Sequence, residues 1–300
     1  MQDTKTLNRY SAGKKVAMLG IVMNIILLVI KLTAGSLSGS QAMMADGFNS
    51  VGDVFASFVA LAGSYYASRP KDSDHFWGHG KAEYIASMII GFSMIAIAVF
   101  MIYSSGAALA AGEKTEFSWW LIGVAIITII IKAGLFIYCM GIGKRYDSLL
   151  IKANAYDHRN DLFVTSGMLL AILCSRLGVY WLDGVAGIVI SVWIAYTGYT
   201  ILRDASKVLM DSNTSVEALH DYENHVMSIS GIDHIDSIVA KPVGVKYILI
   251  IKISVDRDMS VLEGHEIAKR IEVEIMDKHN MEIEDVIVHV NPDLPHGETE

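Results

Sequence analysis

The amino-acid sequence predicts an α-helical membrane protein in which six transmembrane helices precede a small cytoplasmic α+β domain. Two observations carry this prediction. The 300 residues are 53% hydrophobic and only 19% charged, whereas soluble domains average about 45–50% apolar and about 25% charged. Charge is also uneven, because residues 1–210 carry 17 Lys and Arg against 13 Asp and Glu, while residues 211–300 carry 7 against 19. We therefore expect two domains, residues 1–208 in the membrane and residues 209–300 in the cytoplasm.

Six stretches of the first domain are long enough to cross a bilayer, which takes about 20 mostly apolar residues each. The connecting segments on one side hold twelve Lys and Arg, and those on the other side hold only Lys114 and Arg176. Because basic segments remain in the cytoplasm, we expect both termini on the cytoplasmic side of the cell membrane. The first stretch is too long for a secretory signal, so we expect it to be retained. The stretches lie near residues 14–35, 41–66, 82–108, 117–142, 153–175 and 179–202.

From about residue 209 the pattern changes to that of a water-soluble domain. Its periodicity predicts an amphipathic helix, two strands, a second helix and a third strand. This order predicts one sheet with helices on one face. The acidic balance argues against a nucleic-acid partner, and the two cysteines, both in apolar runs, exclude a disulfide framework. The expected helices are 215–229 and 261–278, and the expected strands are 232–240, 246–255 and 285–290.

Two pairs of oxygen-bearing side chains lie four residues apart within the predicted spans. Asn49 and Asp53 are in the second span, and Asp157 and Asp161 are in the fifth. Residues i and i+4 share one face of a helix. An ionisable group in a span costs at least about 2.5–3.5 kcal/mol on insertion scales, so each one needs a reason. Four oxygen donors without cysteine favour Mn²⁺, Mg²⁺ or Ca²⁺, and we interpret the pairs as a site through which a divalent metal ion crosses the membrane.

An alternative interpretation is that these carboxylates only hold the bundle together by pairing with Lys31, Lys132 or Arg159. Two separate i,i+4 pairs are more than packing requires, which favours the metal site. Asp46 lies one helical turn before Asn49. His158 lies about 100° around the helix from Asp157, so we expect it to serve packing rather than to bind the ion.

The segment between the second and third spans contains Asp72, His75 and His79, a combination that suits a mixed nitrogen and oxygen metal site. A membrane metalloenzyme could use the two histidines as a zinc pair. No Glu lies between them to act as a general base, so we do not expect an enzyme. A metal sensor without transport is a further alternative, but a sensor has no need of buried carboxylates in two spans.

Together these features resemble the cation diffusion facilitator family. The similarity covers nearly the whole chain: six spans, paired ligands in spans two and five, an Asp-x-x-His-x-x-x-His-Gly-Lys loop and an α-β-β-α-β tail. Members are homodimeric exporters that exchange cytoplasmic divalent metal ions for protons. The resemblance implies transport ligands at Asn49, Asp53, Asp157 and Asp161 and loop ligands at Asp72, His75 and His79.

The resemblance also bears on the transported ion. Zinc-transporting members usually carry His at one or two of the four transport positions, whereas Asn and Asp followed by two Asp is the manganese pattern. The chain is therefore similar to the manganese branch. Mn²⁺ is the expected substrate, with Zn²⁺, Fe²⁺, Co²⁺ or Cd²⁺ as alternatives, and no organic cofactor is expected.

Two further features are implied by the resemblance alone. The first is an interlock between Lys81 and Asp211. The second is a metal site in the tail, whose family positions fall on Asp236, Lys252, His265, His289 and Asn291. Lys252 and Asn291 depart from the family pattern, and a protonated lysine offers no lone pair to a metal. The expected tail ligands are therefore Asp236, His265 and His289.

Overall fold

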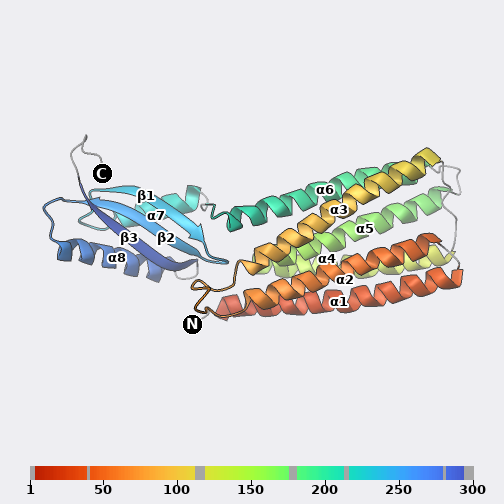
Figure 1. Cartoon of the computed structure of the whole chain (residues 1–300), viewed down its shortest axis with the longest axis horizontal. Helices are drawn as coiled ribbons and strands as arrows, with labels where there is room; N and C mark the ends of the chain where they lie inside the picture. Colours follow the sequence, from red (N-terminus) through yellow and green to blue (C-terminus); the bar gives the residue numbers. More distant parts are fainter. Residues whose placement is uncertain are drawn as a thin grey trace. The chain divides into compact units, whose positions relative to one another are not determined.

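A computed structural model describes residues 4–38, 41–111, 119–175, 181–212, 216–279 and 282–293 of the chain. The chain forms two compact units, one joining Met1–Asp72 with Ala82–Ser206, and the other joining Ser73–Lys81 with Lys207–Glu300. The described elements, in order (Figure 1), are α1 (Thr4–Ser38), α2 (Gln41–Ala67), α3 (Ala82–Ala111), α4 (Trp119–Arg145), α5 (Leu149–Ser175), α6 (Trp181–Leu209), α7 (Val216–Met227), β1 (His234–Pro242), β2 (Tyr247–Val255), α8 (Val261–His279) and β3 (Ile283–Pro292).

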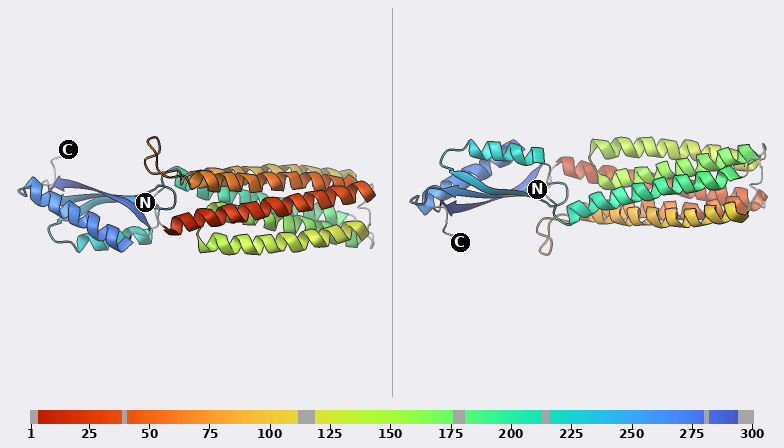
Figure 2. Two further views of the ribbon diagram at one scale, coloured as in Figure 1. Left: turned by 90° about the horizontal axis from the view of Figure 1, so that it is seen from below. Right: turned by 90° about the horizontal axis from the view of Figure 1, so that it is seen from above.

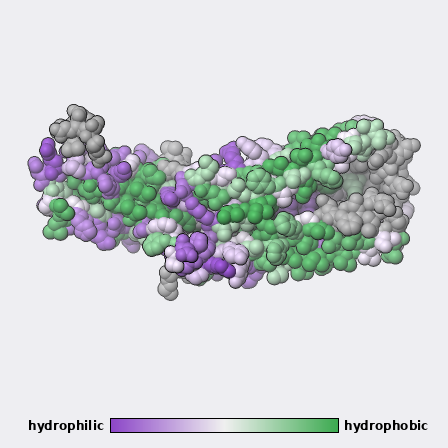
Figure 3. All heavy atoms as spheres, viewed as in Figure 1, coloured by the Kyte–Doolittle hydropathy of each residue, from purple (hydrophilic) through white to green (hydrophobic). Residues whose placement is uncertain are grey.

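Helices α1 to α6 run side by side as a bundle (Figure 2). By length and composition of the described residues, α1, α3, α4 and α6 can each cross a membrane, and α2 and α5 are the helices that carry the acidic pairs. The bundle exposes large apolar side chains, among them Phe100, which is 69% exposed, and it buries Lys132, which is 0% exposed. Hydrophobic residues cover much of the face of the bundle that Figure 3 shows. This reverses the pattern of soluble proteins and fits a bundle whose solvent is lipid.

Several helices extend beyond the predicted spans. Helix α1 begins at Thr4 rather than near residue 14, and α6 continues to Leu209 rather than ending near residue 202. The prediction ended each span with its apolar run, but polar residues such as Lys, Arg and Gln are good helix formers and continue the helix. The extension of α1 brings Arg9 to Glu83 of α3. At the start of the predicted span, Lys14 Nζ donates to Ser68 Oγ, just after α2, at 2.7 Å.

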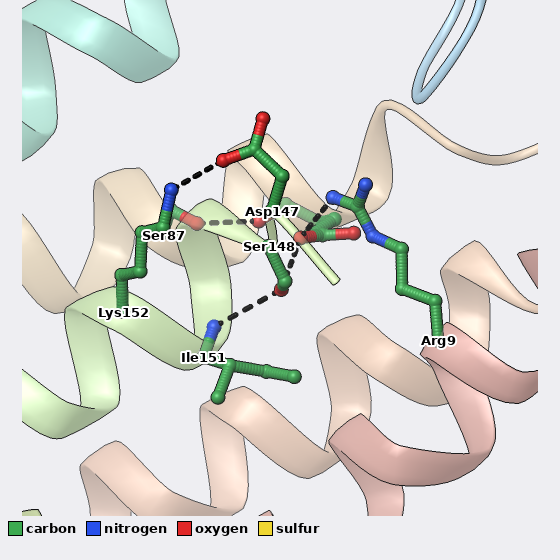
Figure 4. Close-up of polar contacts among 7 residues, drawn as sticks. Arg9, Ser87, Asp147, Ser148, Ile151 and Lys152 are labelled. Atoms are coloured by element: carbon green, nitrogen blue, oxygen red, sulfur yellow. Dashed lines mark hydrogen bonds and ion pairs between the residues drawn. The ribbon is translucent and has the colours of Figure 1, made fainter. Parts of the chain in front are cut away.

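A buried polar cluster joins three helices at the end of the bundle where α3 begins (Figure 4). Arg9 Nη2 of α1 donates to Glu83 Oε1 of α3 at 2.7 Å, and both side chains are at most 5% exposed. Ser148 Oγ donates to the same Glu83 oxygen. Ser148 also accepts a hydrogen bond from the backbone N–H of Ile151 at 3.2 Å, so it caps the N-terminus of α5. The cluster therefore fixes α1 and α5 to the start of α3.

The second unit contains a three-stranded sheet in the order β1-β2-β3, in which β1 is antiparallel to β2 and β3 is parallel to β2. Alternate β2 residues such as Ile251 and Ile253 are fully buried against Ile271 and Ile275 of α8, while Lys252 between them is exposed on the other face. The helices thus cover one face of the sheet. The predicted α-β-β-α-β fold is confirmed.

Candidate functional site

Four charged side chains from three helices meet inside the bundle. Asp53 comes from α2, Asp157 and Asp161 come from α5, and Lys132 comes from α4. Lys132 Nζ donates to Asp53 Oδ2 at 2.8 Å and also to Asp161 Oδ2. Asp53 is 5% exposed and Asp157 is 7% exposed. Asp53 of α2 and Asp161 of α5 therefore face one another across the buried ammonium of Lys132.

Asp157 and its neighbour His158 differ from the other two aspartates in having buried atoms without partners. Asp157 Oδ2 and both ring nitrogens of His158 have no hydrogen-bond partner within the described residues. Ligand atoms of Asp157, His158 and Asp161 lie within 4.8 Å of one another. We expected His158 to serve packing, yet its imidazole is close enough to join the two carboxylates around one ion.

The backbone around Asp53 is positioned by α1. Asn24 Nδ2 lies 3.1 Å from both the carbonyl oxygen of Asp53 and the hydroxyl oxygen of Ser57, and it donates to both. These bonds fix the middle of α2 against α1. Asn49 lies in α2 one turn before Asp53, but its side chain and that of Asp46 fall outside the described part of the structure.

The alternative that the carboxylates pair with basic residues holds for one of the three candidates. Lys132 bonds to Asp53 and Asp161. Arg159 instead donates to Thr197 Oγ1 of α6 at 3.0 Å, and its guanidinium lies 4.6 Å from the ring centre of Tyr156. Lys31 of α1 is buried and acts on Asp161 electrostatically. The ammonium of Lys132 thus bonds to Asp53 and Asp161, while Oδ2 of Asp157 has no hydrogen-bond partner among the described residues.

The loop before α3 brings its three predicted ligands together. Ligand atoms of Asp72, His75 and His79 lie within 4.8 Å of one another, and the two imidazole rings are 4.2 Å apart between centroids. Gly78 adopts a φ of 82° and donates its backbone N–H to the carbonyl of His75 at 2.9 Å. This glycine turn returns His79 toward His75, because glycine adopts positive φ at little cost.

Lys81 and Asp211, the pair implied by the resemblance, are in contact. Lys81 Nζ lies 2.6 Å from Asp211 Oδ1, and Lys241 Nζ lies 3.0 Å from Asp211 Oδ2. The hydrogen bond from Lys81, with help from Lys241, holds the pKa of the Asp211 carboxyl below its usual range. Whether the pair works as an interlock stays a prediction.

The tail residues are arranged differently from the expected set. Asp236 accepts hydrogen bonds from Ser254 Oγ at 3.1 Å and Asn291 Nδ2 at 3.0 Å. His289 is paired in register with Lys252, on the sheet face opposite α8, whereas His265 lies exposed on α8. His289 thus lies on the sheet face opposite α8 and His265 lies on α8 itself, and the tail site of Asp236, His265 and His289 stays a prediction.

A different acidic group forms in the tail. Ligand atoms of Asp233, His234 and Asp293 lie within 4.8 Å of one another, and all three residues are exposed. His234 Nδ1 lies 2.7 Å from Asp233 Oδ2, and His234 Nε2 lies 3.2 Å from Asp236 Oδ1. The hydrogen bond with Asp233 raises the pKa of His234.

Comparison with known proteins identifies the chain. The transmembrane domain of the cation efflux family matches residues 17–210, and the cytoplasmic domain of cation efflux proteins matches residues 214–293. The chain belongs to the cation efflux family. This confirms the resemblance drawn from the sequence, and it makes the protein a metal cation efflux transporter of the membrane rather than an enzyme. The cytoplasmic domain of this family is a dimerisation domain.

Relatives of this cation efflux transporter match along almost its whole length. The uncharacterized transporter YdbO of Bacillus subtilis is 33% identical over 98% of this chain and 99% of its own. The manganese efflux system protein MneP of the same organism is 31% identical over 95% of this chain and 97% of its own. The manganese efflux system protein MneS of Bacillus subtilis is 29% identical over 93% of this chain and 96% of its own.

Sequence reasoning underrated three residues of the transporter. Lys132 was one of three candidate partners, although it is the only charged residue of α4 before the final basic turn, which was the signal available. His158 was set aside because its position on the helix turns it away from Asp157. His234 was not named among the expected ligands, although it connects Asp233 with Asp236 at the surface, and the Asp233-His234 dipeptide was its only local sign.

Proposed function

We propose that this cation efflux transporter exports Mn²⁺ from the cytoplasm in exchange for protons, with Asn49, Asp53, Asp157 and Asp161 as ligands of the transported ion. The observation that carries the proposal is the gathering of three carboxylates inside the bundle, because ligand atoms of Asp157 and Asp161 lie within 4.8 Å of one another and Lys132 joins Asp161 to Asp53. Carboxylate and amide oxygens suit Mn²⁺. Two relatives named as manganese efflux proteins support the same ion.

Proton exchange follows from the chemistry of the ligands. A carboxylate must be deprotonated to bind metal, so protons and metal compete for the same oxygens. Asn49 cannot take part in this competition because a side-chain amide does not titrate in this range. The coupling to protons therefore resides in the three aspartates.

A second candidate substrate is Zn²⁺, with Fe²⁺, Co²⁺ and Cd²⁺ as further alternatives. One observation favours zinc: a ring nitrogen of His158 lies within 4.8 Å of ligand oxygens of Asp157 and Asp161. Imidazole suits zinc better than it suits manganese. Mn²⁺ remains our proposal because the four oxygen ligands outnumber one nitrogen and because two relatives are named as manganese efflux proteins.

The proposal also covers the rest of the chain. Two copies form a homodimer through the cytoplasmic domain, both termini lie in the cytoplasm, residues 1–208 span the cell membrane, and residues 209–300 sense metal. Asp72, His75 and His79 hold a second ion in the loop, and Lys81 with Asp211 acts as the interlock. In the tail, Asp233, His234 and Asp293 are better placed within one chain to hold an ion than Asp236, His265 and His289.

Flux measurements in proteoliposomes test the proposal. Mn²⁺-dependent proton flux should be present in the wild-type protein and lost in Asp157→Ala, and it should exceed flux with Zn²⁺ or Fe²⁺. Asp204→Asn is the matched control because Asp204 is an exposed acidic residue of α6, and this variant should transport like the wild type. Unchanged Mn²⁺ flux in Asp157→Ala would refute the proposed site.

Selectivity is tested at Asn49. An imidazole at this position would add a nitrogen ligand, so Asn49→His should shift transport toward Zn²⁺ or Cd²⁺. A variant that continued to move Mn²⁺ and to reject Zn²⁺ would show that this residue does not set selectivity.

A further inference from the structure

Lys132 is a buried cation in the middle of an apolar helix. Its side chain is 0% exposed and is among the largest fully buried side chains of the described residues. The other basic residues of α4, Lys144 and Arg145, lie in its last turn. A charge near the centre of a transmembrane helix costs at least about 2.5–3.5 kcal/mol. The lysine therefore has to be explained by what it contacts.

Its contacts are the carboxylates of the transport site. Lys132 Nζ lies 2.8 Å from Asp53 Oδ2 of α2 and is also hydrogen-bonded to Asp161 Oδ2 of α5. The ammonium thus bridges the two helices that supply the proposed metal ligands. A divalent ion would bind these oxygens at about 2.0–2.6 Å. The ammonium and the metal ion therefore cannot occupy the position between Asp53 and Asp161 at the same time.

The charges of the site favour such an exchange. Asp53, Asp157 and Asp161 gather three acidic groups, and the ammonium of Lys132 balances part of their charge at the position that a divalent ion would take. Lys31 of α1, which is also buried, adds positive charge near Asp161. Part of the negative charge of the aspartates is therefore balanced by the ammonium of Lys132, which belongs to the protein itself. A lysine side chain suits this task because its ammonium is a point charge on a flexible four-carbon stem.

We propose that Lys132 is a tethered competitor of the transported metal ion. Its ammonium bridges Asp53 and Asp161 when metal is absent, swings away when metal binds, and returns to help to expel the metal on release. This inference rests on the proposed function, since it assumes that the three aspartates bind the metal. Lys132 then sets the affinity of the site for the metal ion. Without the lysine, the site binds metal more tightly and releases it more slowly.

Mn²⁺ binding to the purified full-length protein in nanodiscs, measured by titration calorimetry, tests the proposal. Changing a group that contacts metal ligands alters affinity by about 10–100-fold. Lys132→Met should bind Mn²⁺ at least about tenfold more tightly than the wild type and turn over more slowly in proteoliposomes. Lys132→Arg, which keeps the charge, should stay close to the wild type in affinity. A merely structural lysine would give equal or weaker binding in Lys132→Met.

A rescue experiment keeps the test decisive if Lys132→Met alone does not fold. Asp161→Asn leaves one lysine against two carboxylates and should weaken Mn²⁺ binding, whereas Asp161→Asn combined with Lys132→Met restores two uncompensated carboxylates. The double variant should regain at least about tenfold in affinity over Asp161→Asn. A folded double variant without this gain would overturn the role of Lys132.

A failure of the proposed function gives a different result from a failure of the role assigned to Lys132. If Asp157→Ala binds Mn²⁺ like the wild type, the transport site itself is wrong, whatever Lys132 does. If Asp157→Ala loses binding while Lys132→Met gains none and the double variant shows no rescue, the transport site stands and only the tethered competitor is refuted.

Discussion

The bundle and the cytoplasmic domain each gather two aspartates and a histidine with ligand atoms within 4.8 Å of one another, Asp157, His158 and Asp161 in one and Asp233, His234 and Asp293 in the other. The residue types are the same, but the surroundings are opposite. In the bundle, Asp157 Oδ2 and both His158 nitrogens are buried without hydrogen-bond partners in the described residues. In the domain, His234 is exposed and hydrogen-bonded to Asp233.

This difference decides what each cluster does without a metal ion. Buried polar atoms without partners are costly, so the bundle group gains from any cation that reaches it. The exposed group is solvated, and its histidine is hydrogen-bonded to a carboxylate that raises its pKa. A metal ion would have to displace both water and a proton there. We therefore expect the same three residue types to bind a metal ion more strongly in the bundle than in the domain.

The largest expected effect compares one aspartate from each cluster. Asp157→Asn should reduce Mn²⁺ flux in proteoliposomes by at least about 100-fold, because losing a ligand costs more than the 10–100-fold typical of outer partners. Asp233→Asn should leave flux within about twofold of the wild type, since exposed charges contribute little. Comparable losses in the two variants would show that burial does not distinguish the clusters.

The second prediction extends the comparison to stability. Glu83→Ala removes the partner of the buried Arg9 and should destabilise the bundle by about 3–5 kcal/mol. Glu223→Ala removes an exposed partner of His220 and should change stability little. Thermal unfolding of both variants in the same detergent gives the comparison. A Glu83→Ala variant as stable as the wild type would mean that the buried pair does not hold α1 to α3.

The third prediction concerns two glycines of the second unit. Gly244 and Gly231 both have positive φ, near 100°, so alanine should cost about 1–2 kcal/mol at either position. A Cβ at Gly244 would lie 2.9 Å from the Cα of Gly80, whereas a Cβ at Gly231 would meet only the Cδ1 end of Ile267. Backbone cannot move aside as a side chain can, so Gly244→Ala should lower the unfolding midpoint more. Equal shifts would exclude the approach to Gly80 as a constraint.

The smallest expected effect is at Lys81 and Asp211, whose side chains are 35% and 36% exposed. Lys81→Ala should cost at most about 1 kcal/mol, measured as faster hydrogen exchange in residues 73–81. The pair lowers the pKa of Asp211, so its contribution is present above the ordinary aspartate pKa of about 3.9 and is lost as the pH falls through the lowered value. A difference between the variant and the wild type that grew in acid would contradict this sign.

Local patterns in the sequence were sufficient to predict the helices and strands. Apolar runs predicted six long helices, of which α1, α3, α4 and α6 are long and apolar enough to cross a membrane within their described residues. Alternation predicted the strands of the tail, and i,i+4 spacing predicted that Asp157 and Asp161 share one face of α5. Helix ends were less predictable, because Arg9 continues α1 beyond the predicted span without being apolar. A hydropathy pattern marks where lipid begins, whereas a helix ends where its backbone bonding ends.

The partners of the site could not be read from the sequence, because no local pattern says which helix faces which. Lys31, Lys132 and Arg159 were equal candidates to pair with the carboxylates. In the structure Lys132 bonds to Asp53, whereas Arg159 donates to Thr197 of α6. The pairing of Arg9 with Glu83 joins residues 74 positions apart. Such contacts depend on the packing of whole helices.

Anomalous diffraction from crystals grown with Mn²⁺ tests the central claim most directly, because it locates the ion without relying on activity. The account predicts an anomalous peak inside the bundle, about 2.0–2.6 Å from oxygens of Asp53, Asp157 and Asp161, with Lys132 displaced. A peak at Asp233, His234 and Asp293 alone, with Lys132 still bridging Asp53 and Asp161, would contradict it.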